Sequence, residues 1–208
     1  MFDSDLTADS SSRKTSRRTF LLSAAVLGAG VYFLNMGIFS KKTETEEAGI
    51  RPKTNEAPSE VTIVEFTDAG ERKETVHVPK MVKSDAEWQK ELPPNAYNIT
   101  RHDDTEMAFS GQYWNNHEQG IYRCICCGTA LFSSDTKFES GTGWPSFYQP
   151  IAEENVESID DTTFGMRSTA VACTRCDAHL GHVFSDGPRP TGQRYCMNSA
   201  SLKFVKKA

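Results

Sequence analysis

Two Cys-x-x-Cys pairs constrain this chain more than any other feature of its sequence. Cys124 and Cys127 form the first pair, Cys173 and Cys176 form the second, and 45 residues separate them. Two residues between thiolates allow both sulfur atoms of a tight turn to face one ion, and two such turns complete a tetrahedral site. Because four thiolates leave no open coordination position, the pattern predicts one structural zinc ion. The long gap indicates that the metal joins two parts of a larger fold.

Other readings of these cysteines remain open at this point. The pairs are also compatible with two disulfides, or with one redox-active pair of the thioredoxin kind. The duplication of the motif favours zinc. A zinc hydrolase or deaminase does not fit, since four thiolates leave no site for an activated water. Cys126 lies inside the first pair, but the two-residue spacing has the better ligand geometry, so Cys126 is expected to be free.

Composition bounds the class of protein. The 208 residues are 38% hydrophobic and 25% charged, which is typical of one globular domain with appendages. Six cysteines are too few for a disulfide scaffold in a chain of this length. The net charge of −5 argues against a nucleic-acid binder, whose affinity depends on neutralising phosphates.

The first forty residues have the layout of an export signal or membrane anchor. Arg17-Arg18 precedes an apolar run, Phe20–Phe39, that is about the length a helix needs to cross a bilayer. The run from Ser16 to Leu22 resembles a bacterial twin-arginine signal, although a plain anchor oriented by its arginines is the alternative. No good cleavage site follows the apolar run. The remainder of the chain is therefore expected outside the cytoplasm, in the periplasm or anchored to the outer face of a bacterial inner membrane.

The rest of the chain divides into three parts. Residues 41–60 are polar and form a predicted linker, and residues 61–83 are expected to form a β-hairpin extension. Residues 84–208 form the main domain, which opens with a short helix that begins at Ser84 and stops at Pro93-Pro94. Short strand-like runs then dominate, so the fold is predicted to be mainly β. The predicted strands cover residues 120–123, 129–132, 164–171, 182–184 and 194–204.

Cys196 is separate from both pairs and is a candidate nucleophile. In a strand, Arg194, Cys196 and Asn198 project from the same face because side chains alternate with period two. Positive charge lowers the pKa of a thiol and raises its reactive fraction. A lone cysteine is more often a buried apolar residue, so both readings stay open. His179 and His182 supply imidazoles that are able to donate protons, although each taken alone is more often structural.

Four long motifs occur in order and carry a family resemblance. The region from about Trp88 to Val205 resembles a methionine-R-sulfoxide reductase of the B class, over more than half of the chain. The matching runs are YRCICCG at 122–128, GTGWPSF at 141–147, CTRCDAHLGHVFSDGP at 173–188 and TGQRYCMNS at 191–199.

The resemblance implies a fold, a cofactor and a reaction. The implied fold is a β-tent of two antiparallel sheets, with structural zinc held by the four paired cysteines. The implied activity is reduction of the R epimer of protein-bound methionine sulfoxide, in repair of oxidised exported proteins. Cys196 is implied as the nucleophile, which becomes a sulfenic acid, and Trp144 as the apolar wall that holds the substrate's S-methyl group. The implied active-site residues that polarise the sulfoxide oxygen and steady the thiolate are His179, His182, Asp186, Arg194 and Asn198.

One departure from the family affects the reductive half of the cycle. Many members have a resolving cysteine where this chain has Thr142. Cys126 is the remaining cysteine, and its reach to Cys196 is doubtful because it lies within the metal knuckle. The chain is therefore expected to use a one-cysteine cycle, in which an external thiol, from a thioredoxin-like donor, reduces the sulfenic acid.

A second class of function competes with the enzyme. The chain could be a zinc-clipped β module that only binds a partner, with Cys196 as a structural thiol. The phase of Arg194 and Asn198 with Cys196, together with the GTGWPSF run, favours the enzyme. The expected partners are oxidised proteins, a thiol donor, and the membrane or translocation machinery at the N-terminus. Nothing in the sequence argues for an oligomer, so a monomer is expected.

Overall fold

The computed structural model describes residues 59–161 and 168–207. The predicted export segment, residues 1–40, and residues 41–58 of the predicted linker lie outside the described residues. Among those described, no helix is long and apolar enough to cross a membrane. The strands and α-helices are β1 (Glu60–Phe66), β2 (Arg72–Pro79), α1 (Asp85–Glu91), α2 (Pro94–His102), β3 (Gly120–Cys124), β4 (Ala130–Ser133), β5 (Lys137–Phe138), β6 (Ser146–Phe147), β7 (Val156–Asp161), β8 (Ser168–Cys173), β9 (His179–Phe184), β10 (Arg194–Met197) and β11 (Leu202–Lys206).

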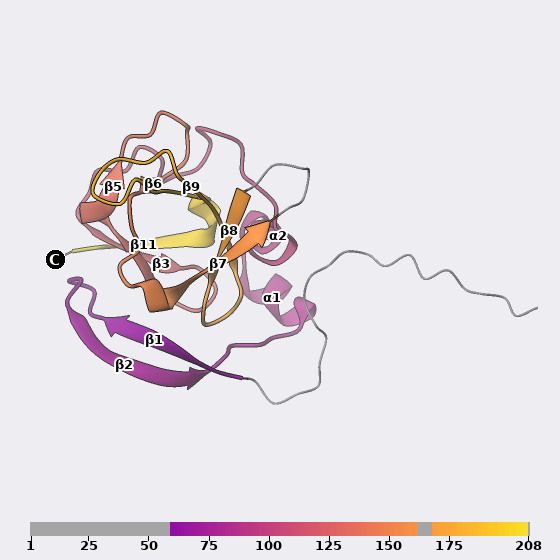
Figure 1. Ribbon diagram of the computed structural model, residues 1–208. Helices are drawn as coiled ribbons and strands as arrows, with labels where there is room; N and C mark the ends of the chain where they lie inside the picture. Colours follow the sequence, from indigo (N-terminus) through magenta and orange to yellow (C-terminus); the bar gives the residue numbers. More distant parts are fainter. Residues whose placement is uncertain (1–58, 162–167, 208) are drawn as a thin grey trace, which may run out of the picture. The chain divides into compact units, whose positions relative to one another are not determined.

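Antiparallel sheets make up most of the regular secondary structure of the described residues, which confirms the predicted mainly-β class (Figure 1). The larger sheet has six strands in the order β5-β6-β10-β9-β8-β7, and the smaller has three in the order β11-β3-β4. These two sheets are the pair that a β-tent requires. The hairpin of β1 and β2 forms a further two-stranded sheet, as the sequence predicted.

The helical part is longer than the sequence predicted. The expected first helix is α1, and the Glu87 side chain accepts a hydrogen bond from the backbone N–H of Ser84 at its N-terminus. This helix ends at Glu91, before Pro93-Pro94, as predicted, but the second helix, α2, which begins at Pro94, was not predicted. Proline suits the first turn of a helix, where its missing N–H has no intrahelical partner. The same proline pair therefore ends one helix and starts another.

Two strand predictions also need correction. The run 194–204 is not one strand: β10 lies in the six-stranded sheet, β11 lies in the three-stranded sheet, and a 3-10 turn, Ser199–Ser201, connects them. β7 was not predicted, because its acidic residues are unfavourable in strands. Of the predicted run 164–171, only residues 168–171 are described, and they belong to β8.

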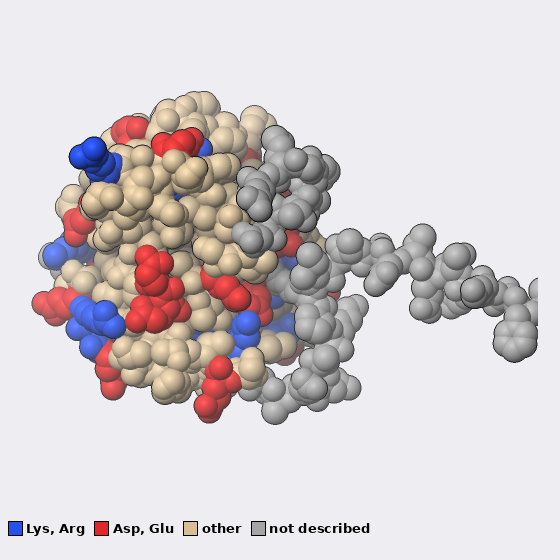
Figure 2. Space-filling model, viewed as in Figure 1, with Lys and Arg blue, Asp and Glu red and all other residues tan. Residues whose placement is uncertain are grey.

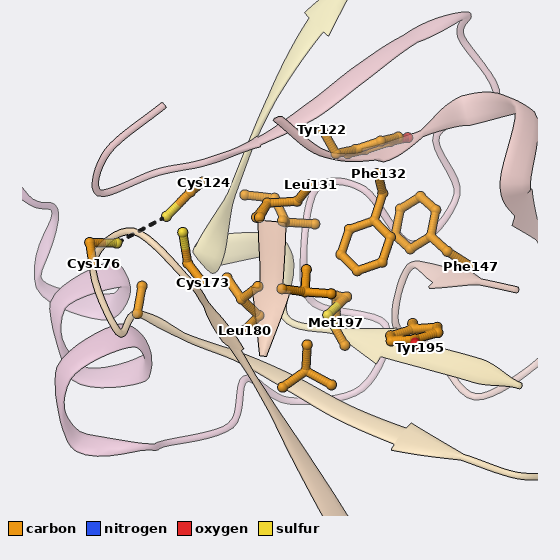
Figure 3. Close-up of a cluster of buried hydrophobic side chains, with 14 residues drawn as sticks. Tyr122, Cys124, Leu131, Phe132, Phe147, Cys173, Cys176, Leu180, Tyr195 and Met197 are labelled. Atoms are coloured by element: carbon orange, nitrogen blue, oxygen red, sulfur yellow. Dashed lines mark hydrogen bonds between the residues drawn. The ribbon is translucent and has the colours of Figure 1, made fainter. Parts of the chain in front are cut away.

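The main hydrophobic core lies between the two larger sheets (Figure 3). Phe132 of β4 stacks on Phe147 of β6, with ring centroids 4.5 Å apart, and Tyr122 of β3 meets Phe147 edge to face at 5.0 Å. Cys124 and Cys173 lie at the opposite end of this core from the aromatic rings, as Figure 3 shows. The core therefore holds one sheet against the other with aromatic packing at one end and sulfur atoms at the other.

Asn155 fastens the β1–β2 hairpin to the rest of the domain. Its side chain is fully buried, and its Oδ1 accepts a 2.7 Å hydrogen bond from the Val64 N–H. Its Nδ2 donates to the carbonyl oxygens of Val64 and Ala130, at 2.9 and 2.8 Å. A buried carboxamide with its partners satisfied orders the elements that it joins. The hairpin extension is thus part of the folded body.

Candidate active site and metal centre

Each Cys-x-x-Cys pair straddles the end of a strand and the turn that follows it. Cys124 ends β3 and Cys173 ends β8, so the first cysteine of each pair is fixed by a sheet. In both turns the residue four positions on, Gly128 or Asp177, adopts a left-handed conformation and donates its N–H to the carbonyl of that cysteine. The two turns thus have the same hydrogen-bonded shape, although they belong to different sheets.

The four sulfur atoms of these pairs, which are those of Cys124, Cys127, Cys173 and Cys176, all lie within 4.8 Å of one another. The Sγ atoms of Cys124 and Cys176 are 3.7 Å apart, and those of Cys127 and Cys173 are 3.5 Å apart. A tetrahedral zinc ion with Zn–S bonds of ~2.3 Å needs sulfur atoms about 3.8 Å apart. The cluster therefore fits a structural zinc ion with little rearrangement, and the prediction of this cofactor is confirmed.

Cys126 is not one of these four residues, although its thiol interacts with those of Cys124 and Cys176. Its Sγ donates a hydrogen bond to Oγ1 of Thr100, a buried residue of α2, at 3.4 Å. Within the cluster, hydrogen bonds from Cys124, Cys173 and Cys176 hold the pKa of Cys127 well below its usual range. A lowered pKa favours the thiolate form that a metal ligand needs.

Cys196 lies in β10, at the centre of the six-stranded sheet. Its neighbours across the strands are Ser146 on β6 and His182 on β9. Arg194, two residues earlier on the same face, is paired with Phe184 of β9. Tyr195 and Met197, which alternate with them, are buried in the core. The predicted phase of Arg194 and Cys196 is confirmed by this alternation, and both residues are partly buried.

Arg194 is held in place by a carboxylate and an aromatic ring. Its Nε and Nη2 donate to the two carboxylate oxygens of Asp186 at 2.9 and 2.8 Å, and its guanidinium lies 4.3 Å from the centroid of Phe184. The hydrogen bonds from Arg194 lower the pKa of Asp186, and Asp186 raises the pKa of Arg194. As pH falls through the lowered pKa of Asp186, the carboxylate takes up a proton and the ion pair is lost.

The two histidines lie side by side on β9. Their ring centroids are 5.2 Å apart, in an edge-to-face arrangement. His182 is directly across the strand from Cys196, whereas His179 is buried, with its Nδ1 4.0 Å from a carboxylate oxygen of Asp103. The structure thus places the His182 imidazole opposite the thiol, and the His179 imidazole meets that of His182 edge to face.

Asn198 follows the last residue of β10, and its backbone is still extended, with φ −71° and ψ 129°. Its Nδ2 donates to the carbonyl of Leu180 at 3.3 Å, and its Oδ1 accepts from the N–H of Glu106 at 3.1 Å. Both ends of its buried carboxamide thus bind backbone. Asn198 anchors the segment that follows the reactive strand.

Glu106 is a residue that the sequence analysis missed. Its carbonyl oxygen accepts the Trp144 indole N–H at 3.1 Å, and its carboxylate accepts the N–H groups of Ser199 and Ala200 at 2.6 and 3.1 Å. With its N–H bound to Asn198, Glu106 connects the indole to the end of β10. No local sequence signal could have found it, since all of its partners are distant in the chain.

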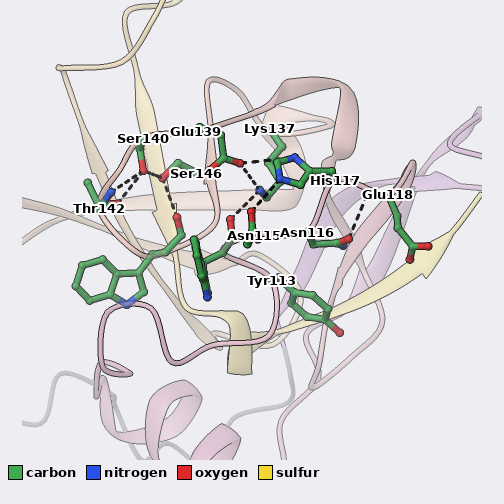
Figure 4. Close-up of polar contacts among 12 residues, drawn as sticks. Tyr113, Asn115, Asn116, His117, Glu118, Lys137, Glu139, Ser140, Thr142 and Ser146 are labelled. Atoms are coloured by element: carbon green, nitrogen blue, oxygen red, sulfur yellow. Dashed lines mark hydrogen bonds and ion pairs between the residues drawn. The ribbon is translucent and has the colours of Figure 1, made fainter.

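Three hydroxyl groups form a chain that ends at Cys196, and this arrangement was also missed. The Ser146 hydroxyl donates to Oγ of Ser140 at 2.7 Å, and Ser140 is 2.8 Å from Oγ1 of Thr142 (Figure 4). Thr142 Oγ1 is 3.8 Å from Sγ of Cys196. A thiolate at Cys196 only accepts, so the Thr142 hydroxyl then donates to the sulfur and the Ser140 hydroxyl donates to Thr142.

The fold and these sites define a β-sheet protein with a four-thiolate zinc centre and a further cysteine on a polar sheet face. Residues 92–206, more than half of the chain, match the SelR domain. The chain is 57% identical over 125 residues to the peptide methionine sulfoxide reductase MsrB of Herminiimonas arsenicoxydans, covering 60% of this chain and 91% of that protein. Its identity to MsrB of Leptospira interrogans is 58% over 125 residues, covering 60% and 95% respectively.

A third relative, the MsrB of Acinetobacter baylyi, is 59% identical over 124 residues, which cover 60% of this chain and 89% of that protein. The chain therefore belongs to the SelR domain family, which confirms the resemblance found in its motifs.

Proposed function

We propose that the protein reduces the R epimer of peptide-bound methionine sulfoxide to methionine, with Cys196 as the nucleophile. The observation that carries the proposal is the partly buried Cys196, flanked by His182 and Arg194 and faced by the Thr142 hydroxyl, in a SelR-family chain. The alternative, a zinc-clipped binding module without catalysis, is not favoured, because it gives no reason for this grouping.

The reaction balances as a two-electron exchange. The thiolate of Cys196 attacks the sulfoxide sulfur while a protonated His182, with His179 behind it, supplies a proton to the oxygen. The sulfoxide sulfur is reduced to the thioether of methionine, and Cys196 is oxidised to a sulfenic acid that retains the oxygen. Two external thiols then convert the sulfenic acid back to the thiol, giving a disulfide and water.

The other residues of the site have supporting roles in this proposal. Trp144 forms the apolar wall for the S-methyl group, and Arg194, held by Asp186, provides positive charge for the thiolate. Asn198 is a positioning residue, because its carboxamide binds the backbone on both sides of the site. The reducing thiol is external, from a thioredoxin-like or other thiol donor, since Thr142 stands where a resolving cysteine occurs in many family members.

Replacing Thr142 with valine should slow the reaction of Cys196 about tenfold, because valine keeps the shape of threonine and removes the proton donated to sulfur. The measurement is the rate at which iodoacetamide alkylates Cys196, followed by mass spectrometry because other cysteines are present. Thr142→Ser restores the hydroxyl and should restore the rate. An equally fast valine variant would contradict a role for the hydroxyl chain.

The proposed function is tested by supplying the separate R and S epimers of peptide-bound methionine sulfoxide with dithiothreitol. The expected result is turnover of the R epimer alone, because exchange of methyl and oxygen would bring the oxygen against Trp144. No turnover of either epimer by folded, zinc-loaded protein would refute the enzyme and leave the binding module.

The sequence also supports a proposal about where the reaction occurs. Arg17-Arg18 and the apolar run Phe20–Phe39 suit export through the twin-arginine pathway, with retention as a membrane anchor. The donor would then act outside the cytoplasm, and the substrates would be exported proteins damaged by oxidative stress.

We also propose that the protein is a monomer. On the face drawn in Figure 2, acidic and basic side chains are interspersed.

A further inference from the structure

Two large apolar side chains are exposed next to the Trp144 turn. Met107 is 77% exposed and Phe109 is 56% exposed, and both lie in the segment between α2 and β3. Exposed apolar residues scattered singly need no explanation, but a pair beside a reactive site indicates an interaction surface. We call these two residues the apolar ledge.

The backbone holds the ledge in a strained conformation. Phe109 has a φ of 64°, a left-handed conformation that bulky residues seldom adopt. Its N–H donates to the carbonyl of Gly143 at 2.8 Å, and its ring meets Trp114 edge to face at 5.3 Å. Such strain persists only where surrounding contacts impose it, and it is concentrated at functional sites. The fold thus keeps a phenylalanine ring partly in solvent at a fixed position.

Glycine at position 143 is required for this arrangement. Gly143 has a φ of 90°, and a Cβ added there would lie 2.8 and 2.9 Å from two carbon atoms of the Phe109 ring. The ring therefore rests directly against the backbone that precedes Trp144. At the other end of the segment, Glu106 accepts the indole N–H of Trp144. Residues 106–109 are consequently held at both ends against the Gly143–Trp144 turn.

We propose that the apolar ledge binds apolar residues that flank the methionine sulfoxide in an unfolded or locally unfolded polypeptide. This inference rests on the proposed function, since it extends the substrate site from Trp144 onto Phe109 and Met107. Methionine and phenylalanine offer adaptable apolar contact area that suits varied sequences. A single methionine sulfoxide residue has no flanking side chains to place there.

The test compares two substrates that share the reacting group. One is a peptide with leucine on both sides of methionine-R-sulfoxide, and the other is N-acetylmethionine-R-sulfoxide amide. The variants are Met107→Gln, which keeps an unbranched side chain, and Phe109→Asn, which keeps the left-handed backbone without strain. Val82→Ser is the matched control, because Val82 is an apolar side chain with a similar exposure, 72%. It lies next to the metal turn and away from Trp144: the N–H of the preceding residue, Met81, donates to the carbonyl of Arg175.

We expect the double variant to lose about tenfold in kcat/KM for the peptide, through KM, and less than about twofold for the single-residue substrate. The Val82 control should match wild type on both. Equal losses on both substrates would overturn the ledge, because Phe109 would then only support Trp144. Unchanged kinetics on both would also overturn it, as would a wild-type dimer that the double variant dissociates without a kinetic change. Wild-type protein that reduces neither substrate would refute the proposed function itself.

Discussion

The Cys196→Ser variant is expected to lose reduction of the R epimer by at least three orders of magnitude, roughly the loss seen when a covalent nucleophile is removed from an enzyme. A serine hydroxyl is far less acidic and less nucleophilic than a thiol, and it cannot form a sulfenic acid. Turnover of the peptide with dithiothreitol measures the loss.

Cys126→Ser is the matched control for this variant. Cys126 is not one of the four clustered cysteines, and serine keeps a donor for Thr100, so this variant should leave turnover and zinc content near those of wild type. Mass spectrometry of the oxidised wild-type protein adds a second readout, namely one added oxygen on Cys196. A disulfide between Cys126 and Cys196 after oxidation by substrate would contradict the one-cysteine cycle.

The second large effect is expected at the metal. Cys173→Ser removes a buried zinc ligand at the end of β8, and zinc binding by structural sites is a direct source of folding free energy. A loss of ~5 kcal/mol would lower the Tm by roughly 10–20 °C in a domain of this size. Differential scanning calorimetry and the zinc content of the purified protein provide the measurement.

Prolonged chelation of the wild-type protein should give the same result as Cys173→Ser, because both treatments remove the same cross-link. If Cys173→Ser retained one zinc ion and melted with wild type, the four-thiolate assignment would be wrong. The Cys126→Ser control should show neither change. These comparisons separate the loss of a metal ligand from the loss of any buried or partly buried cysteine.

Local spacing made the metal centre and the reactive strand predictable. Two-residue knuckles and period-two alternation are properties of a few consecutive residues, so the four ligands and the phase of Arg194 with Cys196 could be inferred from the sequence. The path of the chain after Cys196 could not. The 3-10 turn that follows Asn198 is held by Glu106, 92 residues away, which binds the Asn198 carboxamide and the N–H of Ser199.

Other structural features could not be predicted from the sequence for similar reasons. α2 has a proline at its start, which was read as the end of a helix, and its helical state is settled by packing of Ala96 and Tyr97 against Trp88. β7 is rich in acidic residues, which are unfavourable in strands, and it is a strand because it pairs with β8. The contact of Thr142 with Cys196 depends on two residues 54 positions apart in the chain. Each of these features depends on long-range contacts that local patterns do not encode.

The zinc cysteines come from strands of different sheets, with Cys124 ending β3 of the smaller sheet and Cys173 ending β8 of the larger. The two sheets therefore cannot separate at that end while the metal stays bound. Opening of the core and release of the ion are coupled events. A chromogenic zinc chelator, whose absorbance changes when it binds the released ion, would therefore report core opening directly. The metal thus makes the exposure of the interior a quantity that can be timed.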